Sequence, residues 1–296
     1  MSAKSRWKHI DKRSWSDIKP VWIDVAPQIN SLIAKPEPGI EMTPSLLGIS
    51  LQELQVLSDP EGLRKQVLWE ACRLFAKCNH AKYCAEKLIV AGHPSWAMFN
   101  AYHSAYLGAK TVMWLLGVTL PQVGNDQLII DFFHAIDRKQ RAKYGLTDSR
   151  FEHSHIKKIS KIDQRAVWEA FQRVLRQTKV DKWNSEMVTA LLALDSNKIT
   201  PPRNHFLYRT GYWIFDDLYE NEDLNLQFET EDAQNADAGQ FLLWLCYSVH
   251  SLSSDLFDDL VADSPLVADW RAQVTLGFPV ITETQDLYNR LTSSIV

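Results

Sequence analysis

Residues 95–117 read SWAMFNAYHSAYLGAKTVMWLLG, and this stretch decides the fold class. One row of its apolar residues is spaced four, three, four, three and four positions apart: Met98, Tyr102, Ala105, Ala109, Val112 and Leu116. This spacing puts the row on one face of a helix. Ala105 and Ala109 are small, so a second helix can approach closely at the middle of that face. A second row, Phe99, Tyr106 and Met113, widens the apolar surface, which predicts a central position in a bundle.

A second segment, residues 236–260, repeats the spacing of the first. Its apolar row is Ala238, Leu242, Leu245, Val249, Leu252 and Leu256. Two helices with matching apolar faces are predicted to pack side by side. The ends of the central helix are also marked, because Pro94 suits a first helical turn and Gly117 suits a stop.

Further helices complete the prediction of an all-α, up-and-down bundle. They are expected over 60–90, with a break near Asn79, and over 126–143, 163–178, 183–194 and 201–220. Thr200 supplies an N-cap hydroxyl for the last of these, and Pro201 suits its first turn. Residues 146–158 are predicted to be a polar connection. We find no useful run with the two-residue period of a strand.

Length and composition are those of a globular protein. The chain has 296 residues, of which 46% are hydrophobic and 23% charged, with a net charge of −4. We expect an N-terminal extension over 1–59 docked on a bundle over 60–262, followed by a capping segment over 263–296. No apolar run is long enough to span a bilayer, and the basic N-terminus lacks the apolar core of a signal peptide. The expectation is a soluble, cytoplasmic protein.

Motifs for metals and cofactors are not found in the sequence. The four cysteines, Cys72, Cys78, Cys84 and Cys246, do not have the spacing of a metal site, and we expect buried thiols. The chain also lacks a phosphate-binding glycine loop and the H-E-x-x-H pattern. We therefore expect no metal and no cofactor.

Charge is distributed unevenly along the chain. Residues 138–161 contain eight Lys and Arg against two acidic residues, a net of +6, whereas residues 216–237 contain nine acidic residues and no Lys or Arg. A positive segment of this density can hold a polyanion, although it can also be a solvated surface. The candidate RNA contacts in it are Arg138, Arg141, Arg150, His155, Lys157 and Lys158.

A polar cluster opens the helix predicted at 201–220. Helical geometry places Arg203, Asn204 and Tyr208 on the inward side and His205 and Arg209 on the outward side. An inward Arg needs an anionic or carbonyl partner, and a phosphate satisfies it with two parallel hydrogen bonds. An internal Asp or Glu satisfies it as well, so both interpretations stay open.

Two of these segments resemble the HEPN superfamily, whose members are small helical bundles that often form dimers. YHSAYLGAKTVMWLLG at 102–117 resembles its aromatic and alanine-rich helix, and PPRNHFLY at 201–208 resembles its R-N-x-x-x-H segment. In catalytic members, the Arg and His of R-x4-6-H cleave RNA without a metal at the dimer interface. Arg203 and Asn204 match the first two positions of that motif, but Tyr208 stands at the position of its His.

The resemblance implies an RNA-binding homodimer of a toxin–antitoxin or antiviral defence system, and possible endoribonuclease activity. Arg203 would stabilise charge on the phosphate, and the candidates beside it are Asn204, His205 and Tyr208, with Arg209 as an RNA contact. A second string with the R-x4-H spacing runs from Arg150 to His155. The alternative interpretation is a non-catalytic helical module that binds a protein partner.

Overall fold

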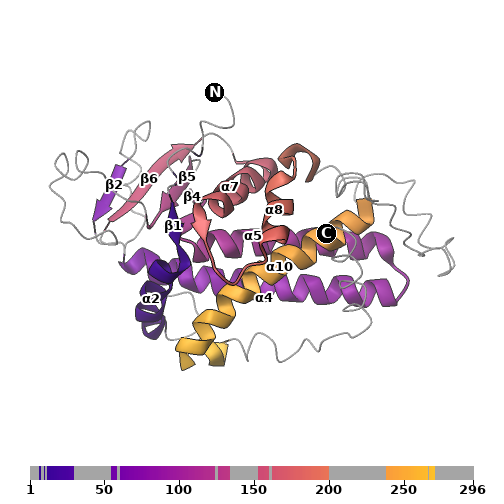
Figure 1. Ribbon diagram of the computed structural model, residues 1–296, viewed down its shortest axis with the longest axis horizontal. Helices are drawn as coiled ribbons and strands as arrows, with labels where there is room; N and C mark the ends of the chain where they lie inside the picture. Colours follow the sequence, from indigo (N-terminus) through magenta and orange to yellow (C-terminus); the bar gives the residue numbers. More distant parts are fainter. Residues whose placement is uncertain are drawn as a thin grey trace. The chain divides into compact units, whose positions relative to one another are not determined.

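The computed structural model describes residues 7, 10, 12–29, 55–58, 61–123, 126–133, 153–159, 162–199, 238–265 and 267–270 (Figure 1). Within these ranges the chain is mostly helical, as predicted, and it also contains short strands. The chain divides into two compact units. The first comprises Met1–Arg73, Lys110–Asp181 and Asp258–Trp270, and the second comprises Leu74–Ala109, Lys182–Phe257 and Arg271–Val296. The long helices α4 (Glu61–Val90), α5 (Pro94–Leu115) and α10 (Ala238–Asp263) contribute residues to both units.

The first unit contains an antiparallel sheet. Its described strands are β2 (Gln55–Ser58), β3 (Val118–Thr119), β4 (Gln122–Val123), β5 (Asp126–Asp131) and β6 (His153–Ile159). The order is β2-β6-β5-β3, and β4 also pairs with β5. Gly117 leads from α5 into β3 with a φ of 81°, a conformation that favours glycine.

Strands β5 and β6 correct two predictions. Residues 126–131 form β5 although a helix was expected, and residues 153–159 form β6 although most of them were assigned to a polar connection. Leu128, Ile129 and Ile130 are all buried, so β5 is covered on both faces. In the sequence of such a strand, apolar residues follow one another without alternating with polar residues. This pattern cannot be distinguished from a short segment of a buried helix. An all-α class is therefore too narrow for this chain, although mostly helical is correct.

Helices of the N-terminal region and of the middle of the chain also belong to the first unit. In α2 (Trp15–Val25), which is followed by the 3-10 helix η1 (Ala26–Gln28), the buried residues include Trp15 and Trp22. The indole nitrogen of Trp22 donates to the carbonyl of Leu115 over 2.6 Å. These contacts place α2 inside the first unit, while the domain boundaries expected at 59 and 262 stay predictions.

Helix α7 (Gln164–Gln177) forms where the sequence predicts it. The carboxylate of Asp163 caps the helix by accepting from the backbone nitrogen of Ala166 over 2.8 Å. Val167, Phe171 and Val174 lie on its buried side. The helix leads into β7 (Thr178–Lys179), which pairs in parallel with β1 (Arg13–Ser14).

The second unit is helical in its described residues. Helices α4 and α5 form an antiparallel hairpin, in which the hydroxyl of Ser104 donates to the carbonyl of Cys78 over 2.9 Å. At Gly108, an added Cβ would lie 3.0 Å from Cγ1 of Val249, so α5 and α10 touch there. This contact confirms that the two helices with matching rows pack together. Helix α8 (Ser185–Ala193), capped by Asn184, confirms the helix predicted at 183–194.

The break expected near Asn79 is wrong, because α4 is continuous from Glu61 to Val90. The side chain of Asn79 is instead held by the ring of His250, 2.6 Å away. The helix predicted at 201–220 and most of the expected capping segment lie outside the described residues. Among the helices that are described, none has the length and apolar character needed to cross a membrane.

Candidate functional site

Most of the residues predicted to act on RNA lie outside the described ranges. These are Arg203, Asn204, His205, Tyr208 and Arg209 in the polar cluster and Arg138, Arg141 and Arg150 in the basic segment. The structure describes the remaining three, His155, Lys157 and Lys158, and all of them lie on β6.

The sheet register separates the side chains of β6. His155 lies opposite Asp131 and Lys157 opposite Ile129, on one face, while Lys158 lies on the other face. His155 is buried, with 1% of its surface exposed, whereas Lys157 is half-buried and Lys158 is exposed. The burial of His155 argues against direct contact with RNA. RNA contacts of Lys157 and Lys158 stay predictions.

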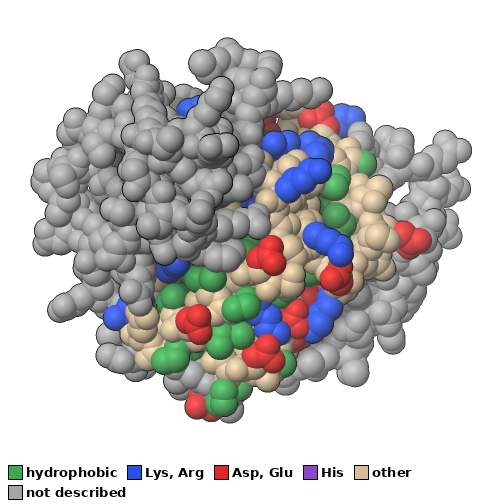
Figure 2. Space-filling model, turned by 60° about the vertical axis from the view of Figure 1, so that its left-hand side comes forward, with side chains coloured by type: hydrophobic (Ala, Val, Ile, Leu, Met, Phe, Trp, Pro, Cys, Tyr) green, Lys and Arg blue, Asp and Glu red, His purple; other side chains and the backbone are tan. Residues whose placement is uncertain are grey.

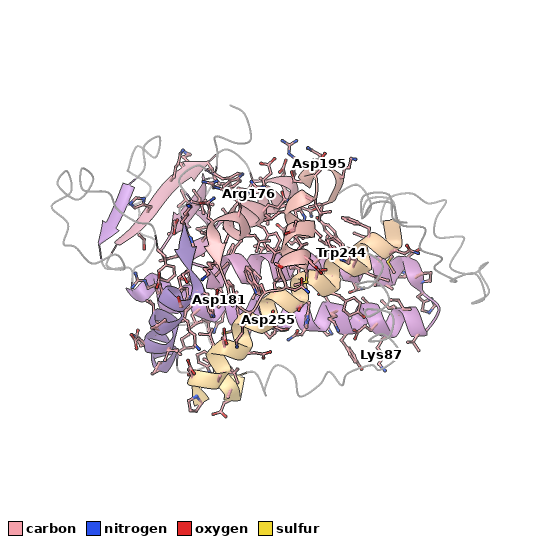
Figure 3. All side chains as sticks on the ribbon, in the orientation of Figure 1. Lys87, Arg176, Asp181, Asp195, Trp244 and Asp255 are labelled. Atoms are coloured by element: carbon pink, nitrogen blue, oxygen red, sulfur yellow. The ribbon has the colours of Figure 1, made fainter. Side chains whose placement is uncertain are left out.

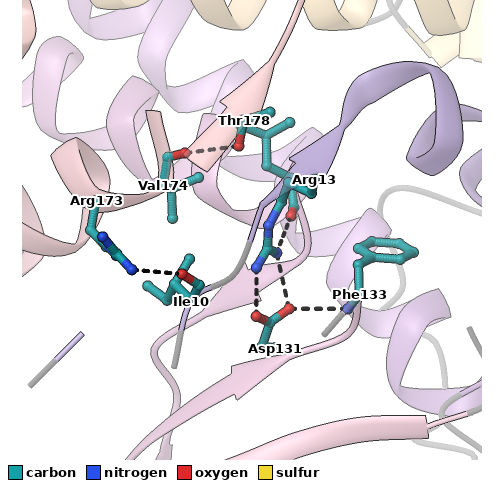
Figure 4. A network of polar contacts seen from close by, with 8 residues as sticks. Ile10, Arg13, Asp131, Phe133, Arg173, Val174 and Thr178 are labelled. Carbon is teal, nitrogen blue, oxygen red and sulfur yellow. Dashed lines mark hydrogen bonds and ion pairs between the residues drawn. The ribbon is translucent and has the colours of Figure 1, made fainter. Parts of the chain in front are cut away.

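A buried ion pair lies at the end of β5 (Figure 4). The guanidinium of Arg13 donates to both carboxylate oxygens of Asp131, over 2.9 Å and 2.5 Å. It also donates to the carbonyl of Leu116 over 2.9 Å, and the backbone nitrogen of Phe133 donates to Asp131 over 3.0 Å. The side chains are 1% and 0% exposed, so the charges are compensated inside the protein.

Arg13 therefore joins three segments of the first unit: β1, the end of α5 and the end of β5. Beside it, Arg173 of α7 donates to the carbonyl of Ile10 over 3.1 Å, and Thr178 lies opposite Arg13 in the paired strands. The pair of Arg13 and Asp131 was not predicted from the sequence, although a charged residue that ends an apolar run, as Asp131 does, is a signal for it. Because no reactant can reach the pair from solvent, its role is structural.

The exposed side of α4 in the second unit is basic. Lys77, His80 and Lys87, which we call the α4 basic stripe, are exposed and follow one another at helical intervals. Figure 3 shows Lys87 pointing away from the helix. Within residues 74–90, Glu86 is the only acidic residue, and it is buried. The stripe thus carries positive charge without a carboxylate among its exposed neighbours on the helix.

The basic residues of the first unit are more evenly balanced by acids. On α7, Arg165 pairs with Glu169 over 3.0 Å, and Lys179 in β7 pairs with Asp181 over 3.1 Å. Arg176 lies on the exposed side of α7 (Figure 3). Figure 2 shows Lys and Arg side chains interspersed with Asp and Glu on the face that it presents. The α4 basic stripe is the clearer cationic feature.

A polar network lies inside the second unit. Glu86 accepts from the ammonium of Lys82 over 2.5 Å and from the hydroxyl of Tyr247 over 2.9 Å, and the ammonium also lies 4.8 Å from the Tyr247 ring centroid. This arrangement neutralises the buried carboxylate of Glu86 and connects α4 to α10. Glu86 therefore does not compensate the positive charge of the α4 basic stripe, which lies on the exposed side of the helix.

The thiols near this network are not activated. Burial raises the pKa of Cys78 to about 11 and that of Cys246 to about 12, and it also raises the pKa of Cys72 in the first unit. A thiol is a nucleophile only as the thiolate, so these groups stay inert near neutral pH. All four cysteines are free thiols. Cys72, Cys78 and Cys246 are buried, as predicted, whereas Cys84 is only half-buried.

The described residues hold no group of three or more His, Cys, Asp or Glu that could bind a metal ion. Comparison with known proteins finds no matching family model, no matching curated protein and no matching solved structure.

Proposed function

We propose that this protein binds RNA, and that it is an HEPN-like protein. The observation that carries the proposal is the α4 basic stripe, which presents Lys77, His80 and Lys87 to solvent in a chain of net charge −4. Lysines that neutralise phosphates release counterions, which favours binding to a polyanion at low salt. The exposed Lys158 and the half-buried Lys157 of β6 supply further positive charge in the first unit.

The test is RNA binding by the full chain, measured by fluorescence anisotropy with a labelled single-stranded RNA of mixed sequence. The variant Lys77→Gln/Lys87→Gln should weaken binding about tenfold at low salt. It should also reduce the slope of log K against log salt by about 1.4, since each phosphate contact on a single strand contributes about 0.7.

The matched control is Lys182→Gln/Lys198→Gln, which removes two charges from other exposed positions of the second unit. It should change affinity by less than about twofold. Equal losses in the two double variants would indicate nonspecific electrostatic attraction. If the parent protein binds no RNA, the proposal fails.

We further propose, from the sequence resemblance alone, that the protein cleaves RNA without a metal. Arg203 would stabilise charge on the phosphate, Asn204 and His205 would assist, and Tyr208 would orient or donate a hydrogen bond. Cleavage should persist with a chelator, and Arg203→Ala should reduce it more than Arg209→Ala does. Tyr208→Phe should also reduce it, whereas equal effects of the two Arg changes would contradict this assignment.

The alternative proposal is a module that binds a protein partner. It is favoured by two large apolar side chains that are exposed at the α4–α5 turn, Val90 at 61% and Trp96 at 42%. An absence of RNA binding combined with a specific protein partner that is lost in Trp96→Ala would support it. A homodimer, and a role in defence, are also proposals that follow from the resemblance.

A further inference from the structure

The aromatic side chain of Trp96 is exposed at the turn between α4 and α5, and neighbouring residues hold it in place. Trp96 lies in the first turn of α5, and its ring packs edge-on against Phe99, with centroids 6.3 Å apart. Phe99 in turn lies 5.6 Å from the ring of His103, and the amide of Asn100 donates to the Trp96 carbonyl over 2.8 Å. The Trp96 ring is thus supported from one side and 42% exposed.

Backbone hydrogen bonds hold the turn itself. The nitrogen of His93 donates to the Leu88 carbonyl over 2.8 Å, and the nitrogen of Ala97 donates to the His93 carbonyl over 3.0 Å. Gly92 adopts a φ of 77° between them. Main-chain hydrogen bonds therefore fix the end of α4 and the beginning of α5, and Trp96 lies in that first turn of α5.

Positive charge lies at the same end of the hairpin. Lys87 is exposed in the last turn of α4, with its ammonium 5.6 Å from the ring centroid of Tyr83. Lys77 is ten residues earlier on the same stripe. At about 1.5 Å per residue the two lysines are about 15 Å apart along the helix, a length of about four nucleotide steps in a stacked strand.

Proteins bind single-stranded nucleic acids with exposed aromatic rings and nearby positive charges, because each ring stacks on a base while lysines contact the phosphates. A duplex keeps its bases paired and stacked, so it offers no free face to the ring. Resting on the RNA binding proposed above, we infer that Trp96 stacks on an unpaired base of a single-stranded RNA whose phosphates lie along the α4 basic stripe.

The experiment compares Trp96→Ala with the parent on a labelled single-stranded RNA and on the same sequence as a duplex. The variant should lose about 5- to 150-fold in affinity for the single strand, the range expected for one stacked base. Affinity for the duplex and the salt slope should stay unchanged, since no phosphate contact is removed. Trp96→Phe should keep most of the affinity, and Val90→Ala, which shortens a neighbouring apolar side chain, should keep nearly all of it.

Photo-crosslinking provides a second measurement on the parent protein. A single-stranded RNA carrying 4-thiouridine should crosslink to the peptide that contains Trp96, and the crosslink should disappear in Trp96→Ala. Equal loss on single strand and duplex, or no loss on either, would overturn the inference while leaving RNA binding intact. Absence of RNA binding by the parent would overturn both. Loss of binding to phosphatidylserine vesicles in Trp96→Ala, with RNA affinity unchanged, would assign the surface to a membrane instead.

Discussion

Arg13 and Asp131 show how a single buried pair can organise the first unit. Both groups lose their hydration on folding, and the loss is offset by two parallel hydrogen bonds and by the backbone groups of Leu116 and Phe133. Each charge is tolerated because the other is present. Removing one partner therefore leaves an uncompensated charge in the interior.

At this residue scale, Asp131→Asn should destabilise the protein by about 3–5 kcal/mol, because it leaves the Arg13 guanidinium buried without its counter-charge. Urea unfolding measures the change. Asp181→Asn is the control, since Asp181 pairs with Lys179 where both side chains are more than three-quarters exposed, at 79% and 78%. It should cost no more than about 1 kcal/mol. Similar costs in the two variants would contradict the importance assigned to the buried pair.

Gly117 is the second position where one residue decides local structure. Its φ is 81°, and an added Cβ would stand 2.0 Å from Cδ2 of Phe133. Gly117→Ala should therefore cost about 1–3 kcal/mol or more, from backbone strain together with the clash. Gly92→Ala is the control, because Gly92 has a similar φ of 77°. The difference between the unfolding midpoints of Gly117→Ala and Gly92→Ala therefore measures the clash with Phe133. A smaller loss at Gly117 than at Gly92 would contradict the tight contact with Phe133.

At the scale of elements, the contact between α5 and α10 depends on small side chains. Ala105, Gly108 and Ala109 are fully or nearly fully buried, and Gly108 faces Val249. The helices approach closely because little side-chain volume separates them. Larger residues at these positions must push the helices apart or distort their rotamers.

Ala105→Leu and Gly108→Leu should each destabilise the protein by about 1–3 kcal/mol, as expected when a packed contact is overfilled. Urea denaturation gives the midpoints. Thr189→Leu, on the exposed side of α8, adds an apolar side chain without filling a packed contact and should leave the midpoint nearly unchanged. Parent-like midpoints for both α5 variants would mean that these helices are not packed as described.

For the whole molecule, buried thiols predict a loss of stability at alkaline pH. The pKa of Cys78 rises from 9.0 to about 11 and that of Cys246 from 9.0 to about 12, mainly because burial disfavours the thiolate. The folded protein therefore keeps protons that the unfolded chain releases above about pH 9. The stabilisation is fully present below pH 9 and is lost as pH rises from 9 toward 11 and 12, with a slope of about 1.4 kcal/mol per pH unit for each thiol.

The measurement is the free energy of unfolding between pH 8 and pH 11. Cys246→Ala should flatten the decline by the contribution of one thiol, since Ala has no proton to release. Cys84→Ala should change the slope less, because Cys84 is only partly buried. A Cys246→Ala profile that falls as steeply as that of the parent would show that this thiol does not titrate as described.

The helices α5 and α10 were predictable from the sequence, because the residues that a helix buries recur at intervals of three and four positions. The rows on α5 and α10 recur at four and three residues, and their members from Met98 to Leu116 and from Leu242 to Leu256 are buried as that spacing requires. Side-chain caps at Asp163 and Asn184, which begin α7 and α8, were not predicted although they are local features. The continuity of α4 through Asn79 was not predictable, because the hydrogen bond that satisfies Asn79 comes from His250, far away in the chain.

By itself, the sequence determined that the described part of the chain is mostly helical, where α5 and α10 run, and which residues carry charge, since these depend on local spacing and composition. Tertiary structure alone decided that residues 126–131 and 153–159 pair as strands, because strand pairing depends on a partner distant in sequence and a strand buried on both faces shows no alternation. It also decided that His155 is enclosed while Lys77 and Lys87 face solvent. Exposure depends on what the rest of the chain places against each side chain.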